Sequence, residues 1–117
     1  MAEANTTDLT MIKGDDFSRT ITIKTDSVAQ DITGWTVYFT IKNDKDDTDA
    51  NAVYQQIITN HSDPTSGITA ISIPHSSSED FELKKYLYDI QTVDTADLVR
   101  TPVRGYFQVT WEITNTE

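Results

Sequence analysis

Residues 35–42 read Trp-Thr-Val-Tyr-Phe-Thr-Ile-Lys, and apolar and polar side chains alternate along them. In an extended chain Trp35, Val37, Phe39 and Ile41 share one face, and the residues between them share the other. Successive side chains of a β-strand point to opposite sides, so this period of two is typical of a strand with one buried face. The segment predicts a strand that belongs to the core of a β domain.

The same alternation recurs on both sides of this segment. Upstream, Phe17, Ile21 and Ile23 share a face that Arg19 interrupts. Strands about ten residues apart favour an antiparallel β-sandwich, with a small barrel as the alternative. The sequence predicts seven or eight strands, at residues 9–12, 17–24, 35–42, 53–58, 68–73, 86–93, 98–103 and 107–113.

The amino-acid composition supports an all-β class. The chain of 117 residues has 19 Thr, 12 Ile and 7 Val but only 4 Leu. Branching at Cβ suits a pleated sheet better than a helix. One short helical turn is expected near residues 76–83, because Ser76 and Glu79 have the spacing of a capping box. Pro102 cannot donate to a ladder, so the strand that contains it should lie or end at a sheet edge.

One domain is expected at residues 9–114. Residues 1–8 are polar and without periodicity, which predicts a flexible N-terminal tail, and residues 115–117 form the C-terminal end. The chain has no cysteine and no apolar run of the roughly 20 residues that a membrane helix needs, and residues 1–8 lack the basic start and apolar stretch of a secretory signal. We therefore expect synthesis in the cytosol and no membrane partner.

The formal net charge is −10, from 19 acidic and 9 basic residues. Affinity for nucleic acids comes largely from Lys and Arg that neutralise phosphates. The nine bases are scattered along the chain, so nucleic-acid binding is disfavoured.

No arrangement of residues predicts catalysis. His61 and His75 are each next to a serine, but neighbours in an extended chain point apart, so we interpret both as loop histidines. Asp89 lies inside a strand and is expected to face solvent or a cross-strand partner. No enzyme activity and no cofactor are expected.

The acidic loop at residues 44–49 could hold a cation. Aligned as an EF-hand loop from Asp44, it has Asp49 in place of the required glycine and Gln55 in place of the final glutamate. A loop site of another kind and a solvated loop tip are the two alternatives.

Aromatic residues divide between the two faces of the expected strands. Trp35 and Trp111 fall on the faces predicted to be inside the core. Tyr38, Tyr54 and Tyr106 have the opposite parity and are the candidate interface residues, because aromatic side chains are enriched where proteins meet.

Several short motifs resemble those of a phage family, over roughly residues 12–114. The segment 12–23 contains a Lys-Gly-Asp turn, and 31–42 begins with Asp-Ile-Thr-Gly and continues as an aromatic strand ending in lysine. The second half adds 61–67, His-Ser-Asp-Pro-Thr-Ser-Gly, then 86–91 and 101–107. Together they resemble the N-terminal domain of phage baseplate upper proteins and related small virion proteins. The segment 86–88, Tyr-Leu-Tyr, also resembles the place of a tyrosine in immunoglobulin-like folds.

The resemblance implies an immunoglobulin-like sandwich that assembles or attaches within a bacteriophage tail, baseplate or other virion appendage. It implies other phage structural proteins as partners, symmetric copies of the chain, and a location in the virion, with the host cytoplasm during assembly. Full baseplate upper proteins continue beyond this domain, so a head decoration protein fits equally well. A module that binds carbohydrate or a host receptor is the alternative function.

Overall fold

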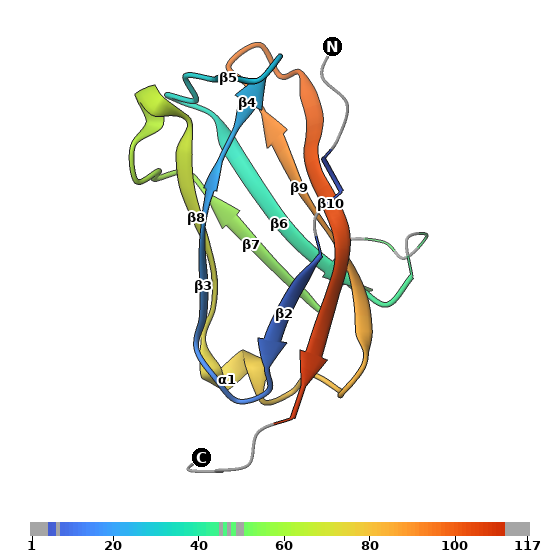
Figure 1. The fold of residues 1–117 in the computed structure, drawn as a ribbon. Coiled ribbons are helices and arrows are strands. Elements are labelled where there is room, and N and C mark those ends of the chain that lie inside the picture. The colour runs from blue at the N-terminus through green and yellow to red at the C-terminus, as the bar shows by residue number, and fades with distance from the viewer. Residues whose placement is uncertain (1–4, 7, 45, 47, 49–50, 112–117) are drawn as a thin grey trace.

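The computed structural model describes residues 5–6, 8–44, 46, 48 and 51–111 of the chain. Strands dominate this part, which confirms a mostly β fold (Figure 1). One larger sheet has the strand order β1-β10-β9-β6-β7, with β2 also paired to β10, and two small sheets are β3-β8 and β4-β5. The strands are β1 (Asn5–Thr6), β2 (Leu9–Ile12), β3 (Phe17–Thr22), β4 (Lys24–Thr25), β5 (Val28–Ala29), β6 (Thr36–Lys42), β7 (Tyr54–Ile58), β8 (Ile68–Ile73), β9 (Lys85–Val93) and β10 (Val99–Thr110).

The central strands of the larger sheet follow the sequence pattern. Val37, Phe39 and Ile41 of β6 are fully buried. On β9, every second residue from Tyr86 to Thr92 is buried as well. β6 pairs antiparallel with β9 on one side and with β7 on the other. The predicted core faces of β6 and β9 are therefore confirmed.

The pair β3-β8 lies against the inner face of the larger sheet (Figure 1). The ring of Phe17 on β3 meets the ring of Phe107 on β10 edge-on, with 5.2 Å between centroids. Ile71 and Ile73 of β8 are fully buried in the same hydrophobic cluster. Aromatic pairs in this geometry add to the free energy of burial, so the contact helps to hold the two sheets together.

The larger sheet is mixed, which corrects the expectation of a purely antiparallel fold. β9 runs antiparallel to β10, but β1 and β2 both run parallel to it. Parallel neighbours need a long connection, and here most of the chain lies between β2 and β10. Asn5 and Thr6 form a strand, in contrast to the flexible tail predicted at residues 1–8. Residues 1–4 and 7, the end of the predicted last strand and the predicted C-terminal end at 115–117 lie outside the described residues.

Neither tryptophan belongs to the core, so this prediction is wrong. Trp111 is 75% exposed. Its parity matches that of Val109, but the pairing of β10 with β2 ends at Thr110, and Trp111 extends past the end of the core. Trp35 precedes β6 and is half-buried.

The sequence predicts that Tyr54 faces outward as a candidate interface residue. In the structure its side chain faces the core. Its ring packs on the core, and its hydroxyl donates to the Ser72 carbonyl oxygen at 2.9 Å. Tyr54 pairs with Ile41 and Ile58 pairs with Val37, so these residues of β7 share the inner face. Ile57, in between, is 60% exposed. A register error of one residue moves every side chain of a strand to the other face, and β7 is such a case.

The two strands predicted on either side of Gly105 form one strand, β10. Pro102 does not end it. Between the pairs formed by Arg100 and by Val103, the two residues Thr101 and Pro102 face the single residue Gln91 of β9. Such a bulge leaves a residue outside the ladder, so it accommodates a proline that has no N–H to donate.

The described residues include a turn of α-helix, α1 (His75–Ser78), and a 3-10 turn, η2 (Pro64–Ser66). The helical turn thus starts one residue before the predicted range of 76–83 and is shorter than that range. Pro74 is the N-cap residue, without a side-chain cap, so the capping box predicted for Ser76 and Glu79 is wrong. Asp16, from another part of the chain, takes the place of the capping box: its Oδ1 accepts a hydrogen bond from the His75 backbone N–H at 2.7 Å.

Candidate binding surfaces

His61 is held in place by both ring nitrogens. Nδ1 lies 2.9 Å from the Thr69 hydroxyl oxygen, and Nε2 lies 2.8 Å from the Trp35 carbonyl oxygen. A carbonyl oxygen only accepts, so in the neutral ring Nε2 donates to Trp35 and Nδ1 accepts from Thr69. These contacts connect the loop after β7 to the start of β6, which is a structural role.

His75 pairs with Asp16, and this pair also holds the fold together. The Asp16 Oδ1 that accepts from the His75 backbone lies 3.0 Å from the ring Nδ1. The backbone hydrogen bond, followed by the side-chain one, lowers the pKa of the Asp16 carboxyl below its usual range. Both side chains are largely exposed, at 57% for His75 and 75% for Asp16. The pair connects the turn between β2 and β3 to α1.

The acidic loop is only partly within the described residues. Asp44 accepts a hydrogen bond from the Asp46 backbone N–H at 3.0 Å, which is a local turn contact. Residues 45, 47 and 49 of this loop lie outside the described part. Among the residues that the structure describes, no group of three His, Cys, Asp or Glu side chains could hold a metal ion.

The Asp-Ile-Thr-Gly motif is a structural turn. Asp31 Oδ1 accepts hydrogen bonds from both the backbone N–H and the hydroxyl of Thr33, at 2.9 and 2.6 Å, and these contacts lower the pKa of its carboxyl. The Trp35 N–H closes the turn onto the Ile32 carbonyl oxygen, and Gly34 takes a φ of 79° at the position where such a turn needs a positive value. Ile32 is fully buried beneath it.

Gly67, at the end of the second turn motif, lies against the backbone of another segment. Its φ is 74°, and a Cβ there would come within 2.5 Å of the Gln30 carbonyl oxygen and 2.6 Å of that of Ile23. Only glycine fits this conformation and this approach. The motif therefore fastens η2 to the β4-β5 hairpin.

Two of the three candidate interface tyrosines lie on the outer face of the larger sheet. Tyr38 on β6 is half-buried, and Tyr106 on β10 is 47% exposed. Tyr54 is on the opposite side, as described above. The strands bring together residues that are far apart in sequence, since Tyr106 pairs with Leu87, which pairs in turn with Lys42.

A row of polar side chains crosses the outer face between these two tyrosines. Its members are consecutive cross-strand partners, namely Gln55 on β7, Thr40 on β6, Asp89 on β9 and Arg104 on β10. Gln55 Nε2 donates to the Thr40 hydroxyl oxygen at 3.1 Å. Thr40 is only 7% exposed although it faces outward, so the side chains around it rise above it.

The outer face is hollowed into a trough of about 800 Å³. The polar row is its floor, and Tyr38, Leu87 and Tyr106 are among its lining residues. Lys42 and Arg104 provide two positive charges against the one negative charge of Asp89. At the edge, the Lys85 ammonium lies 5.2 Å from the centre of the Tyr106 ring, a cation–π contact.

A second hollow, which we call the end cleft, has a volume of about 330 Å³. It lies where the β4-β5 hairpin, the start of β6 and the bulge of β10 meet. Its lining residues are Ile23, Lys24, Thr25, Asp26, Gln30, Trp35, Thr92, Arg100, Thr101 and Pro102. The sequence pattern predicts Trp35 in the core and does not predict this cleft.

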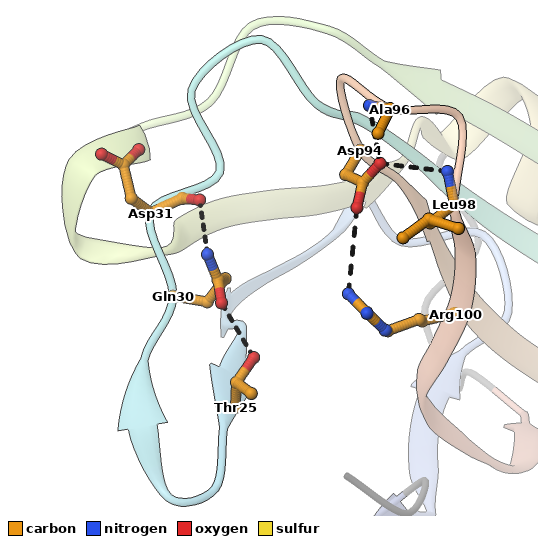
Figure 2. Close-up of polar contacts among 7 residues, drawn as sticks. All are labelled: Thr25, Gln30, Asp31, Asp94, Ala96, Leu98 and Arg100. Atoms are coloured by element: carbon orange, nitrogen blue, oxygen red, sulfur yellow. Dashed lines mark hydrogen bonds and ion pairs between the residues drawn. The ribbon is translucent and has the colours of Figure 1, made fainter. Parts of the chain in front are cut away.

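Hydrogen bonds hold Gln30 of the end cleft and Asp94 beside the cleft in place (Figure 2). Gln30 accepts from the Thr25 hydroxyl at 2.9 Å and donates to the Asp31 carbonyl oxygen at 3.0 Å. On the other wall, the Arg100 guanidinium lies 3.9 Å from Asp94 Oδ2. Asp94 Oδ1 accepts the backbone N–H groups of Ala96 and Leu98, at 2.8 and 3.0 Å, which fixes the loop between β9 and β10.

The chain matches none of the known protein-family models, and no curated protein matches it significantly. In the part of the chain that the structure describes, no helix is long and apolar enough to cross a membrane.

Proposed function

We propose that the chain is an assembly or attachment module of a bacteriophage or prophage particle, without catalytic activity. It docks on other virion proteins, and on copies of itself, through the outer face of the larger sheet. Its location is then the virion, with the host cytoplasm during assembly. The proposal covers a position in a tail, baseplate, head or other appendage.

The observation that carries the proposal is the exposed outer face of the larger sheet. Tyr38, Leu87 and Tyr106 lie on three adjacent strands around a floor of polar side chains. Aromatic residues surrounded by polar groups are enriched at the centres of protein interfaces. Within the described residues no element covers this face, so a partner could reach it.

We further propose that the fold is an immunoglobulin-like sandwich. The order β2-β10-β9-β6-β7 opposite the pair β3-β8 supports it, as does the helical corner before β9. The Tyr86 hydroxyl, at the start of β9, accepts the backbone N–H of Glu82 at 2.8 Å. A tyrosine that returns to the backbone a few residues upstream is a hallmark of such folds.

The virion assignment rests on the motif resemblance. Three of its motifs, at residues 13–16, 31–34 and 61–67, are turns whose side chains hold the loops described above. Because these motifs are structural turns, they support a shared fold more directly than they support a shared binding partner. Neighbouring genes would test the assignment: terminase, portal or tape-measure genes would support it, and a metabolic operon would contradict it.

Native mass spectrometry at rising protein concentration tests the docking surface. We expect oligomers in the wild type and a dissociation constant at least roughly fivefold weaker in Tyr106→Ser, because loss of an interface aromatic costs more than about 1 kcal/mol. Trp111→Ser is the control, since it removes an exposed aromatic residue beyond the end of β10. A strict monomer, or equal weakening in both variants, would contradict docking through this face.

The second candidate function is binding of carbohydrate or a host receptor. The observation that favours it is the end cleft, where a half-buried tryptophan stands beside cationic and hydroxyl-bearing side chains. A glycan array that stays silent would remove this candidate without affecting the first.

A further inference from the structure

We propose that the end cleft binds an acidic sugar, a single pyranose ring that carries a carboxylate. This inference deepens the second candidate function and does not depend on the outer face of the larger sheet. It rests on the size of the cleft, its charge, and the side chains that are held in place before a ligand arrives.

The walls of the cleft are suited to one ring. A volume of about 330 Å³ lies at the lower end of ligand pockets in proteins. Trp35 and Pro102 are among its lining residues, and their rings can provide apolar surface. A pyranose has an apolar face of C–H groups that packs on such surfaces, while its hydroxyls need polar partners around the edge.

Two cationic side chains line the cleft although the chain is strongly acidic, and Asp94 beside Arg100 offsets part of their charge. Lys24 and Arg100 line it together with a single acid, Asp26. The Arg100 side chain is 44% exposed, and its guanidinium lies 3.9 Å from Asp94 Oδ2, an ion pair too long for a hydrogen bond. Its five N–H groups form a planar fork that matches a carboxylate.

The polar side chains are positioned before binding. Asp94 is fixed by two backbone N–H groups and places its other oxygen toward Arg100 (Figure 2). Gln30 is fixed by Thr25 and the Asp31 backbone, which leaves one donor and one acceptor of its amide for a sugar hydroxyl. Positioning of this kind lowers the entropy that a ligand must lose on binding.

Strained backbone is concentrated in the two loops at this end. Among the described residues, the non-glycine residues with positive φ are Asp26 and Ser27 at the tip of the β4-β5 hairpin and Asp97 between β9 and β10. Two consecutive positive φ values form the tight turn that a two-residue hairpin needs. Strain is retained more often at binding sites than elsewhere, which agrees with the proposal without carrying it.

An acidic peptide side chain would also bring a carboxylate, but the apolar walls favour the sugar. A glutamate or aspartate has no broad apolar face to cover the indole of Trp35. A pyranose acid fills both the cationic and the flat part of the cleft. Peptide binding is therefore an outcome for the test to exclude.

The test uses the variant Trp111→Phe, in which Trp35 is the remaining tryptophan and its fluorescence reports on the cleft. The probes are D-glucuronic acid and N-acetylneuraminic acid, with D-glucose as the neutral counterpart of the first and N-acetyl-aspartate as the peptide-like acid. We expect a saturable change in fluorescence with at least one acidic sugar, with a dissociation constant on the order of 1 mM or lower for a ligand of this size.

Further variants identify the residue that binds the carboxylate. Adding Arg100→Gln should weaken binding at least roughly tenfold, because the bidentate pair is lost, while Arg100→Lys should keep part of it. Arg19→Gln makes the same change in charge on β3, outside both the end cleft and the trough, and should leave binding unchanged. Circular dichroism confirms that each variant is folded.

Three results would overturn the proposal: no response to either acidic sugar, an equal response to glucose or N-acetyl-aspartate, or binding that survives Arg100→Gln. An equal response to glucose would still leave glycan binding as a function. Oligomers that weaken in Tyr106→Ser test the first proposed function independently of all three results.

Discussion

Ser78 is fully buried although its side chain is polar. Its Oγ accepts the backbone N–H of Gly14 at 2.8 Å, across 64 positions of sequence. Gly14 is itself buried in the turn between β2 and β3. This bond and the Asp16–His75 pair fasten that turn to α1, so one corner of the fold depends on side chains rather than on a strand ladder.

The Ser78→Ala variant should be destabilised by about 1–3 kcal/mol, because the buried Gly14 N–H loses its acceptor. Urea unfolding followed by circular dichroism gives the change in the free energy of unfolding. Ser76→Ala, at an exposed position of the same helical turn, is the control and should change it by no more than about 0.5 kcal/mol. Equal effects in the two variants would show that the Gly14 contact contributes nothing.

Tyr54 and Tyr88 should ionise later than a free tyrosine. Burial raises the pKa of both hydroxyls, and for Tyr88 burial followed by the charge of Asp8 raises the pKa to about 12. A pKa raised by folding stabilises the fold fully below pH 10, the value for free tyrosine, and this contribution is lost as pH rises toward 12. Absorbance at 295 nm measures the ionisation, and urea unfolding from pH 9 to 12 measures the stability. In Tyr88→Phe the alkaline decline should be smaller; an unchanged decline would assign it to other groups.

At the scale of the strands, the sequence predicted β6 and β9 correctly because apolar residues occur there at one parity. In β7 they occur at both, since Ile57 and Ile58 are adjacent, and the aromatic Tyr54 shares its parity with the polar Gln56. Gln56 Nε2 donates to the Ser72 hydroxyl and Gln56 Oε1 accepts from the Ser72 backbone N–H, and this pair of hydrogen bonds allows a polar residue on the inner face. The parity of β7 is decided by these partners, which the sequence pattern does not contain.

The two adjacent isoleucines provide the test of that parity. Ile58→Ala should cost about 2–4 kcal/mol, because Ile58 is 7% exposed and packs in the core. Ile57→Ala should change stability by no more than about 0.5 kcal/mol. Denaturant unfolding of the two variants gives both values. A larger loss of stability in Ile57→Ala than in Ile58→Ala would mean that Ile57 faces the core, as the sequence pattern predicts.

At the scale of the whole molecule, the candidate sites depend on pairings between distant segments. Gln55 on β7 and Arg104 on β10 both line the trough, although β6 and β9 lie between these two strands. The end cleft forms where the bulge at Pro102 lies close to the β4-β5 hairpin. The parity of Tyr38 and Tyr106 could be predicted from their own strands. Their neighbours could not, because cross-strand partners follow from register and from the parallel pairing of β2 with β10.

The single core also predicts how the molecule unfolds. Buried residues of both β3-β8 and the larger sheet form one hydrophobic cluster, so we expect one cooperative transition in urea, with a dependence on denaturant of about 1–3 kcal/mol per molar. In Trp111→Phe, fluorescence reports the end cleft at one end of the core, and far-UV circular dichroism reports all strands together. The two curves should share a midpoint, because the cleft is lined by Ile23 and Thr92, which are buried with the core. An earlier fluorescence transition would mean that the hairpin end opens on its own, and the side chains that we propose for sugar binding would then be fixed only when a ligand is present.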